Sequence, residues 1–338
     1  MRGGLVARLV DDARRAAVEE TAPSLDAAIA ASADVWFCHD SATAAALLER
    51  RDRRPIWLFQ HAPFSLAFYQ AWCWAVPEWD WRDVNELPDV RELTSWETDV
   101  WSRVDRFLLP CEDALDEVAR LDPHCAALKP SVEYILTGAR AREAASHAGD
   151  RGAQRARWGF GAEPVGLFIG NNQPYRGLDA LLAGLNQLSP SDAPGVVALA
   201  GPDPHMLPPH PRLRALGRVS DVAALLDAVD FVINVNRFSL FDLSTIEAVE
   251  AGRPLLLHDT GGNRTFRALG AGCVMIADLD PATVGDGLRG MFGLSAEERQ
   301  ALGDQSRRCY DHHLTLEHFW RRHAALYAHA GADRVAVS

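Results

Sequence analysis

The sequence lacks the features that would place this protein in several large classes. Its six cysteines are spread along the chain and none forms a C-x-x-C pair. Without such a pair and without clustering, we expect free thiols in a reducing compartment. No uninterrupted apolar run reaches the roughly 18 residues of a membrane span. The first residues also lack an apolar core followed by a small-residue cleavage site, which disfavours a signal peptide. These absences predict a cytoplasmic protein without a transmembrane segment.

Positive charge is also scarce. The chain has 34 Lys and Arg residues against 46 Asp and Glu residues, which gives a formal net charge of -12 at pH 7. Nucleic acids and anionic lipids need a positive field, so neither is expected as a partner. A local basic pocket for one phosphorylated ligand is still compatible with this balance.

Several catalytic signatures are missing as well. The chain has no G-x-S-x-G, no P-loop, and no G-x-G-x-x-G after its first strand, which disfavours a nicotinamide enzyme. Glu78, Asp80 and Asp83 lack a metal-binding frame, and the pair His312-His313 has no third ligand nearby. We therefore expect neither a metal nor a cofactor.

Short apolar strands alternate with helices in the second half of the chain. The predicted strands are 165–170, 196–200, 231–235, 255–258 and 274–277, and the predicted helices include 178–188, 222–229 and 245–251. Strands that alternate with helices of about ten residues indicate crossover units and a parallel sheet. Such sheets bind ligands at the carboxyl ends of their strands.

The first half is similar but less regular. Strands are predicted at 35–38, 56–59 and 107–109, and a tryptophan-rich stretch separates the last two. This stretch is either core, which we favour, or the lining of a substrate site. A length of 338 residues suits two domains. We place them at residues 1–145 and 155–310, followed by a C-terminal helix within 311–338 that packs back toward the first domain. This helix is amphipathic, with Phe319, Trp320 and Leu326 on its apolar side.

The segment Asn236–Pro254 carries the strongest functional signal, because it leads from a strand through a loop into a helix and on to the next strand. It resembles the family 4 retaining glycosyltransferases (glycosyl transferases group 1) of the GT-B fold. In that family a Phe-Gly-Leu loop precedes a helix with Glu-Ala, and the glutamate holds the nucleotide ribose. The resemblance assigns that role to Glu247. It assigns donor phosphate and sugar to the backbone amides of Phe241, Asp242, Leu243 and Ser244.

Physical chemistry agrees with this assignment. A vicinal diol is matched by the two oxygens of a carboxylate. A helix N-terminus presents N–H groups and a positive dipole end to a diphosphate. Ile246, Ala248 and Val249 flank Glu247 with apolar side chains. We therefore expect the Glu247 carboxylate to be buried; the alternative is a solvated helix residue.

Further positions match the family less completely. After the strand at 165–170, the family has Gly-Arg, four residues, and Lys-Gly, with both cations on the diphosphate. Here the corresponding residues are Gly170, Asn171 and Arg176, so one cation is missing. Gly261-Gly262 matches a family Gly-Gly turn, where glycine permits close approach of backbone to ligand.

Two histidines in the first half complete the resemblance. His61 ends a strand, as does a family histidine that reaches the donor sugar across the interdomain cleft. We assign it a hydrogen bond to the sugar or leaving phosphate, rather than the role of a general base. His39 matches an acceptor-side position, and for both histidines the alternative is a polar group at a strand end.

The sequence also departs from the family pattern. The family has a second glutamate eight residues before the helix glutamate, and here that position is Ser239. Asp242 replaces the glycine of Phe-Gly-Leu and either supplies a carboxylate or caps the helix. The opening strand and its Gly-Gly loop are not recognisable, so we expect a shortened N-terminal domain and a natural start upstream of Met1.

These patterns predict a two-domain α/β protein, with two Rossmann-like parallel-sheet domains facing across a cleft. The resemblance implies a metal-independent, retaining glycosyltransferase that uses a nucleotide-diphosphate sugar and a hydroxyl acceptor. Two alternatives are left open, namely a catalytically weak or inactive scaffold that binds a nucleotide sugar, and a nucleotide-sugar epimerase. The sequence does not identify the sugar, the base, the acceptor or the oligomeric state.

Overall fold

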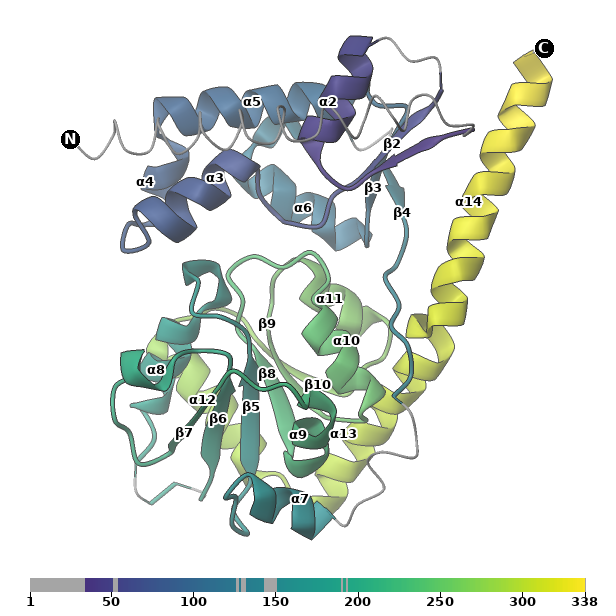
Figure 1. The fold of residues 1–338 in the computed structure, drawn as a ribbon. Coiled ribbons are helices and arrows are strands. Elements are labelled where there is room, and N and C mark those ends of the chain that lie inside the picture. The colour runs from purple at the N-terminus through teal and green to yellow at the C-terminus, as the bar shows by residue number, and fades with distance from the viewer. Residues whose placement is uncertain are drawn as a thin grey trace. The chain divides into compact units, whose positions relative to one another are not determined.

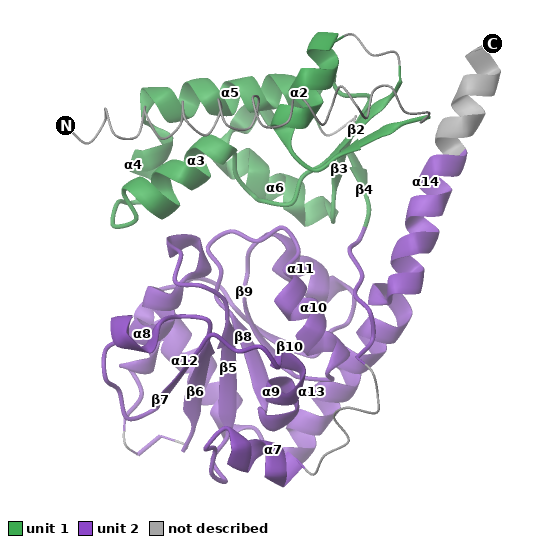
Figure 2. Ribbon diagram, viewed as in Figure 1, with its two compact units in different colours: residues 1–135 green, residues 136–338 purple. Residues whose placement is uncertain are grey.

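The computed structural model describes residues 34–50, 54–125, 128, 132–142, 151–189, 191–192 and 194–337. The chain divides into two compact units, residues 1–135 (unit 1) and 136–338 (unit 2), as Figure 2 shows. The sequence analysis placed the end of the first domain at residue 145. Hydrogen bonds attach Leu136 and Ala139 to unit 2: the Tyr310 hydroxyl donates to the Ala139 carbonyl at 2.9 Å, and Arg322 donates to the Leu136 carbonyl at 3.2 Å.

Unit 1 contains a parallel four-stranded sheet in the order β1-β2-β3-β4 (Figure 1). Its strands are β1 (Trp36–Cys38), β2 (Ile56–Phe59), β3 (Arg106–Leu109) and β4 (Val132–Tyr134). Its helices are α2 (Ser41–Arg50), α3 (Leu66–Gln70), α4 (Trp81–Asn85), α5 (Pro88–Arg103) and α6 (Glu112–Leu121). The first three strands confirm the predictions. We missed β4, because three residues with a central glutamate give no hydrophobic pattern. The expected loss of an opening strand concerns residues outside the described part.

The tryptophan-rich stretch divides between core and surface. Trp72 and Trp101 are buried. The Trp101 indole stacks on Phe107 with ring centroids 5.1 Å apart, and its N–H donates to Ser41 Oγ at 2.9 Å. Trp74, in contrast, is 61% exposed. The core interpretation is therefore right for Trp72 and Trp101 and wrong for Trp74.

Unit 2 contains a parallel six-stranded sheet in the order β10-β9-β8-β5-β6-β7. Its strands are β5 (Val165–Ile169), β6 (Val196–Ala200), β7 (Leu213–Gly217), β8 (Phe231–Asn234), β9 (Leu255–His258) and β10 (Cys273–Ile276). Its helices are α7 (Arg151–Arg157), α8 (Leu178–Leu185), α9 (Val222–Ala228), α10 (Leu243–Glu250), α11 (Gly261–Ala268), α12 (Pro281–Gly293), α13 (Ala296–Cys309) and α14 (Leu316–Val337). The five predicted strands are all present, and β7 was missed because two arginines and three prolines at 208–214 break its pattern.

The strand order of unit 2 reverses at β5. From β5 the chain moves outward through β6 and β7, then returns to the other side of β5 for β8, β9 and β10. The loops after β5 and β8 therefore lie next to each other at the carboxyl ends of these strands, at the point where open α/β sheets bind ligands. This is where both segments singled out in the sequence, 170–176 and 236–247, come together.

A close-packed core holds the sheet of unit 2 in place. Helices α8 and α12 pack against one face, with Leu181 and Leu288 fully buried. A Cβ atom on Gly184 would lie 2.4 Å from Val284 Cγ1, so only glycine allows this helix contact. Apolar burial of this kind is the main stabilising term for the frame that carries the site.

The C-terminal helix α14 confirms the helical prediction, and its predicted apolar face is right for Leu326 and wrong for Trp320. Trp320, expected on the apolar side, is 60% exposed, whereas Leu326 and His323 are buried. The expected packing of this segment toward the first domain stays a prediction. Within the described residues, no helix combines the length and the apolar character needed to cross a membrane. All six cysteines are free thiols, as expected.

Candidate functional site

An ion pair joins the two loops at the reversal of strand order in unit 2. Arg176, from the loop after β5, pairs with Asp242, from the loop after β8. A second arginine reinforces this junction. Arg237 donates to both Asp179 oxygens at 2.8 and 2.6 Å and to the Pro174 carbonyl at 2.6 Å. These contacts connect the loops after β5 and β8, and together the two loops form the edge of unit 2 that is described below.

Asp242 is the electrostatic centre of this edge. It caps helix α10 by accepting from the Ser244 backbone N–H at 3.0 Å, and it also accepts from Asn236 Nδ2 at 3.0 Å. Burial alone would raise the pKa of Asp242, but the Arg176 charge and these hydrogen bonds hold it below its usual value. The capping alternative for Asp242 is therefore confirmed. The Ser244 amide, predicted to face the donor, is occupied by this cap.

Arg176 lies in a short 3₁₀ turn, with 22% of its side chain exposed. Burial would lower its pKa, but Asp242 raises it, so the guanidinium stays charged. Its buried Nε–H has no hydrogen-bond partner in the described part of the chain. A guanidinium carries five N–H donors. Asp242 therefore leaves part of this cation available to a second anion.

The two glutamates of helix α10, Glu247 and Glu250, differ in burial and in ion pairing. Glu250 is buried, pairs with Arg142, and lies 3.1 Å from Arg307 Nη1. Glu247, one turn earlier, is exposed and forms no ion pair with any described residue. Partial burial raises the pKa of Glu247, and the negative charges of Asp242 and Glu250 add to this effect. The predicted burial of Glu247 is wrong, because its apolar neighbours occupy the inner face of the helix and leave the carboxylate at the surface.

A buried polar network, which the sequence analysis missed, lies under the loop after β8. Asn263 Nδ2 donates to the His258 carbonyl at 3.0 Å, and Asn234 Nδ2 donates to Thr245 Oγ1 at 2.9 Å. Ser239, which stands where the family has a glutamate, is 3% exposed and donates to Asn263 Oδ1 at 3.4 Å. The only sequence signal was an asparagine at the end of an apolar strand.

Gly262 lies against protein backbone, and the predicted approach of the glycine pair to a ligand stays a prediction. The Gly262 N–H donates to the Ser239 carbonyl at 2.9 Å. A Cβ atom at position 262 would lie 1.7 Å from the Leu240 carbonyl oxygen. Gly261, with φ of +37°, opens helix α11 directly against this loop. The pair thus positions the loop after β8 from beneath.

The other residues predicted to contact the donor substrate differ in burial. Phe241 is buried and stacks on Phe266 with ring centroids 4.1 Å apart, whereas Leu243 is 59% exposed. The Gly170 N–H donates to the Ala200 carbonyl at 3.0 Å. Asn171 is exposed, and its side-chain oxygen accepts from the Gln173 N–H at 3.3 Å. The loop after β5 therefore has a single cation, Arg176, as the sequence indicated.

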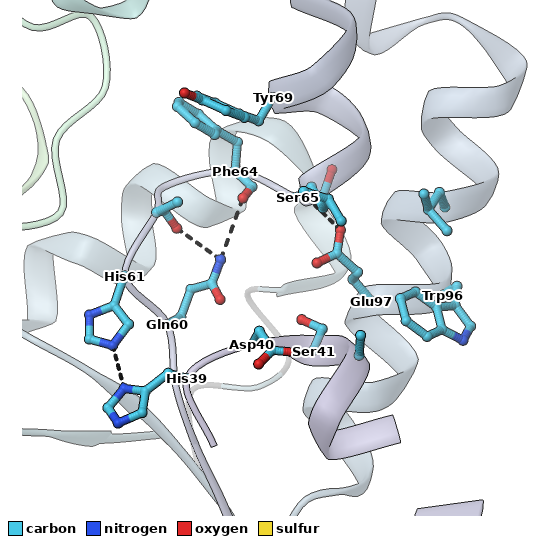
Figure 3. Close-up of a pocket in the computed structure, with 14 residues that line it drawn as sticks. His39, Asp40, Ser41, Gln60, His61, Phe64, Ser65, Tyr69, Trp96 and Glu97 are labelled. Carbon is cyan, nitrogen blue, oxygen red and sulfur yellow. Dashed lines mark hydrogen bonds between the residues drawn. The ribbon is translucent and has the colours of Figure 1, made fainter. Parts of the chain in front are cut away.

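The two predicted histidines of unit 1 meet at the edge of a pocket of about 400 Å³. His39 Nδ1 lies 2.7 Å from His61 Nε2, as Figure 3 shows. Burial lowers the pKa of His61, and the neighbouring His39 lowers it further. The structure thus brings together two residues that the sequence placed at the ends of adjacent strands.

The same pocket contains a carboxyl group that sequence reasoning missed. Glu97, on helix α5, is 4% exposed, and burial raises its pKa to about 7. Its Oε2 atom accepts from the Leu66 backbone N–H at 2.7 Å. The available signal was a charged residue in the buried helical stripe formed by Val90, Leu93 and Val100.

Comparison with known proteins supports the resemblance of unit 2. Residues 163–292 match the family model described as "Glycosyl transferases group 1". This range contains both loops of the site and helix α10. No curated protein matches the chain.

Solved structures of several glycosyltransferases share the fold. HepE from Anabaena, determined in complex with UDP and glucose, has a TM-score of 0.66 at 14% identity, covering 96% of this chain and 81% of that chain. Sucrose-phosphate synthase from Thermosynechococcus elongatus has a TM-score of 0.66 at 14% identity, with 89% and 74% covered. Trehalose 6-phosphate synthase from Burkholderia multivorans has a TM-score of 0.65 at 15% identity, with 91% and 74% covered. The predicted fold class, two parallel-sheet α/β domains of the GT-B type, is therefore confirmed.

Proposed function

From the match of residues 163–292 to group 1 glycosyl transferases and from the GT-B fold, we propose that this protein transfers a sugar from a nucleotide-diphosphate sugar to a hydroxyl acceptor. The observation that carries the proposal is the edge formed by Arg176, Asp242 and Glu247. It lies where the strand order of unit 2 reverses, which is the position where open α/β sheets bind nucleotides.

Each charged group at this edge has a role in the proposed site. Glu247, which lacks a cation partner in the described chain, accepts hydrogen bonds from the two ribose hydroxyls. The part of the Arg176 guanidinium that Asp242 leaves unused binds the diphosphate. Asp242 does not contact the donor. It orients Arg176 and holds helix α10 so that its dipole points at the phosphates.

Retention of configuration and independence from metal belong to the same proposal. The C1–O bond of the donor breaks, the diphosphate leaves with the electron pair, and the acceptor oxygen forms the new bond on the same face. The departing phosphate takes the acceptor proton. Arg176 stabilises the charge that develops on the leaving group, and such pre-aimed charge is often the largest catalytic term. His61 donates a hydrogen bond to the sugar or phosphate.

Donor binding tests the proposal directly. Thermal shift with uridine, guanosine and thymidine diphosphate sugars identifies the donor. Glu247→Ala should then weaken its binding by about 1–3 kcal/mol, because the ribose hydroxyls lose their acceptor. Glu317→Ala is the matched control, since Glu317 is an 82% exposed glutamate of α14 in unit 2. Failure of every nucleotide sugar to bind, or equal binding by both variants, would refute the assignment of Glu247.

A binding protein without turnover is the second candidate, favoured by one observation. Ser239 is buried against Asn263 where the family has a carboxylate, so no glutamate at this position reaches the donor. Release of nucleotide diphosphate, followed with and without acceptors, separates the two functions. Donor binding with no release under any condition favours the scaffold, whereas transfer with retention that persists in a chelator favours the enzyme.

A further inference from the structure

The pocket of unit 1 has apolar walls and an acidic interior. It lies at the carboxyl ends of β1 and β2, and aromatic and aliphatic side chains form much of its wall: Phe64, Leu66, Tyr69, Leu93 and Trp96. Its two ionisable acids are Asp40 and Glu97, and none of the residues that line it is a lysine or arginine. An anionic ligand would therefore meet negative charge without any compensating cation.

Glu97 is the most unusual group of this pocket. It is 4% exposed, and it forms no ion pair with the described residues. Its contacts are hydrogen bonds from neutral groups: the Leu66 N–H at 2.7 Å, the Ala67 N–H and the Ser41 hydroxyl. Burying an ionised carboxylate without a counter-ion is costly, which agrees with a pKa raised to about 7. Figure 3 shows the carboxyl group directed into the space that Gln60 and Asp40 also border. A cation placed there would remove the cost.

The neighbouring polar groups do not supply that cation. Asp40 caps helix α2 by accepting from the Thr43 N–H at 2.7 Å and the Thr43 hydroxyl at 2.8 Å, which fixes its negative charge beside the pocket. Burial and the neighbouring His39 lower the pKa of His61, which disfavours the charged form of this imidazole. The Gln60 amide donates to the Ala62 carbonyl at 3.0 Å.

We propose that this pocket binds an organic ammonium group carried on an apolar body, and that a ligand of this class that also bears a hydroxyl is the acceptor of the reaction proposed above. The ammonium lies beside Glu97, and the apolar body packs against Phe64, Tyr69 and Trp96. Aromatic faces attract a cation as well as apolar surface. A volume of about 400 Å³ is within the range of small-molecule sites. Identification of the ligand as the acceptor depends on the proposed function, but the binding chemistry does not.

Three probes of one shape and different charge test the pocket. They are 2-phenylethylamine, 2-phenylethanol and phenylacetate, titrated into the full chain at about pH 8, where both Glu97 and the amine are largely ionised. We expect the amine to bind at least about 10-fold more tightly than the alcohol, and phenylacetate to bind most weakly. An alcohol that binds as tightly as the amine, or a preference for the acid, would overturn the proposal.

Two variants locate the charge that is recognised. Glu97→Gln keeps an acceptor for the Leu66 N–H but removes the charge. It should weaken amine binding about 10-fold and leave alcohol binding unchanged. Glu92→Gln is the matched control, because Glu92 is an exposed residue of the same helix. Should Glu97→Gln not fold, the comparison of the three probes on the unaltered protein still decides. Amine binding that is insensitive to Glu97→Gln, or equally sensitive to Glu92→Gln, would refute this site.

The proposed amine site and the proposed transferase function can be refuted independently of each other. The probes report on unit 1 without any nucleotide sugar, whereas Glu247→Ala reports on donor binding in unit 2. If the amine binds but no donor does, the pocket stands and the transferase proposal fails. If donors bind and turn over but the amine does not bind, the transferase stands and this inference fails.

Discussion

Both units are parallel sheets covered by helices, yet only unit 2 reverses its strand order among the described strands. The reversal places two loops edge to edge, and their charges pair: Arg176 with Asp242, and Arg237 with Asp179. Unit 1 runs in one direction from β1 to β4, and its pocket is completed by helices α3 and α5. There the carboxyl group of Glu97 is buried without a cation.

The same layered architecture therefore carries two sites that differ in charge: one with paired charges in unit 2, and one with an unpaired acid in unit 1. In unit 2, two neighbouring loops bring backbone amides and capped helix ends together, which suits a diphosphate. A pocket between a strand end and a long amphipathic helix is mostly apolar, and one acid in it dominates the field. Removing each of these charged groups in turn tests the difference between the two units.

The largest effect is expected at the ion pair of unit 2. Arg176→Met leaves the Asp242 carboxylate buried without its cation and should destabilise unit 2 by about 3 kcal/mol. Hydrogen exchange of strands β5 and β8 measures this loss. Arg321→Met is the control, because its ion pair with Glu317 is exposed and contributes little. Adding Asp242→Asn to Arg176→Met should recover part of the loss; no recovery would mean that the pair is not the cause.

The next effect concerns Glu97, where removing the charge should increase the stability of the protein. Because its pKa rises from 4.5 to about 7 on folding, the folded protein binds more protons than the unfolded chain between these values. Stability therefore falls as pH rises through this window. Glu97→Gln should be more stable than the unaltered protein at about pH 8, by at most about 3 kcal/mol, and equally stable near pH 4.5.

Tryptophan fluorescence suits this measurement, because eight of the ten tryptophans precede residue 136 and report mainly on unit 1. Glu92→Gln should show no pH-dependent difference. A Glu97→Gln variant that is less stable than the unaltered protein at about pH 8 would contradict the unpaired state of Glu97.

A smaller effect is expected where the loop of unit 2 is positioned by backbone contact. Gly262→Ala forces a Cβ atom against the Leu240 carbonyl oxygen and should cost about 2 kcal/mol. Gly290→Ala, in helix α12, is the control, because no atom lies within 4 Å of the added Cβ. This control should be neutral or slightly stabilising, since alanine favours helix. Equal thermal shifts for the two variants would argue against the close approach.

The smallest effect on stability should come from Glu247. Glu247→Ala removes an exposed side chain with no ion pair among the described residues, so stability should change by less than about 0.5 kcal/mol. Urea unfolding monitored by circular dichroism provides the measurement. Glu250→Ala, three positions along the same helix, should be clearly destabilising because it breaks the pairs with Arg142 and Arg307. A large loss for Glu247→Ala would indicate a structural role instead of donor binding.

Much of the fold could be read from the sequence, because the strands of unit 2 are apolar runs that end at glycine or polar residues. The Asp242 cap, the single cation Arg176 and the loop-to-helix passage also follow from local pattern. Strands β4 and β7 could not be predicted, since each is short or interrupted by charge. The exposure of Trp320 and Glu247 was predicted wrongly, because apolar neighbours do not specify which face of a helix is covered.

The sequence by itself determined the alternation of strands and helices, the helix caps and the charge types near each strand end, because these depend on neighbours along the chain. Only the tertiary structure decided that Arg176 meets Asp242, that His39 meets His61, and that Glu97 is buried without a cation. Those facts depend on residues 22 to 66 positions apart being brought together by the sheets, and on the burial that follows.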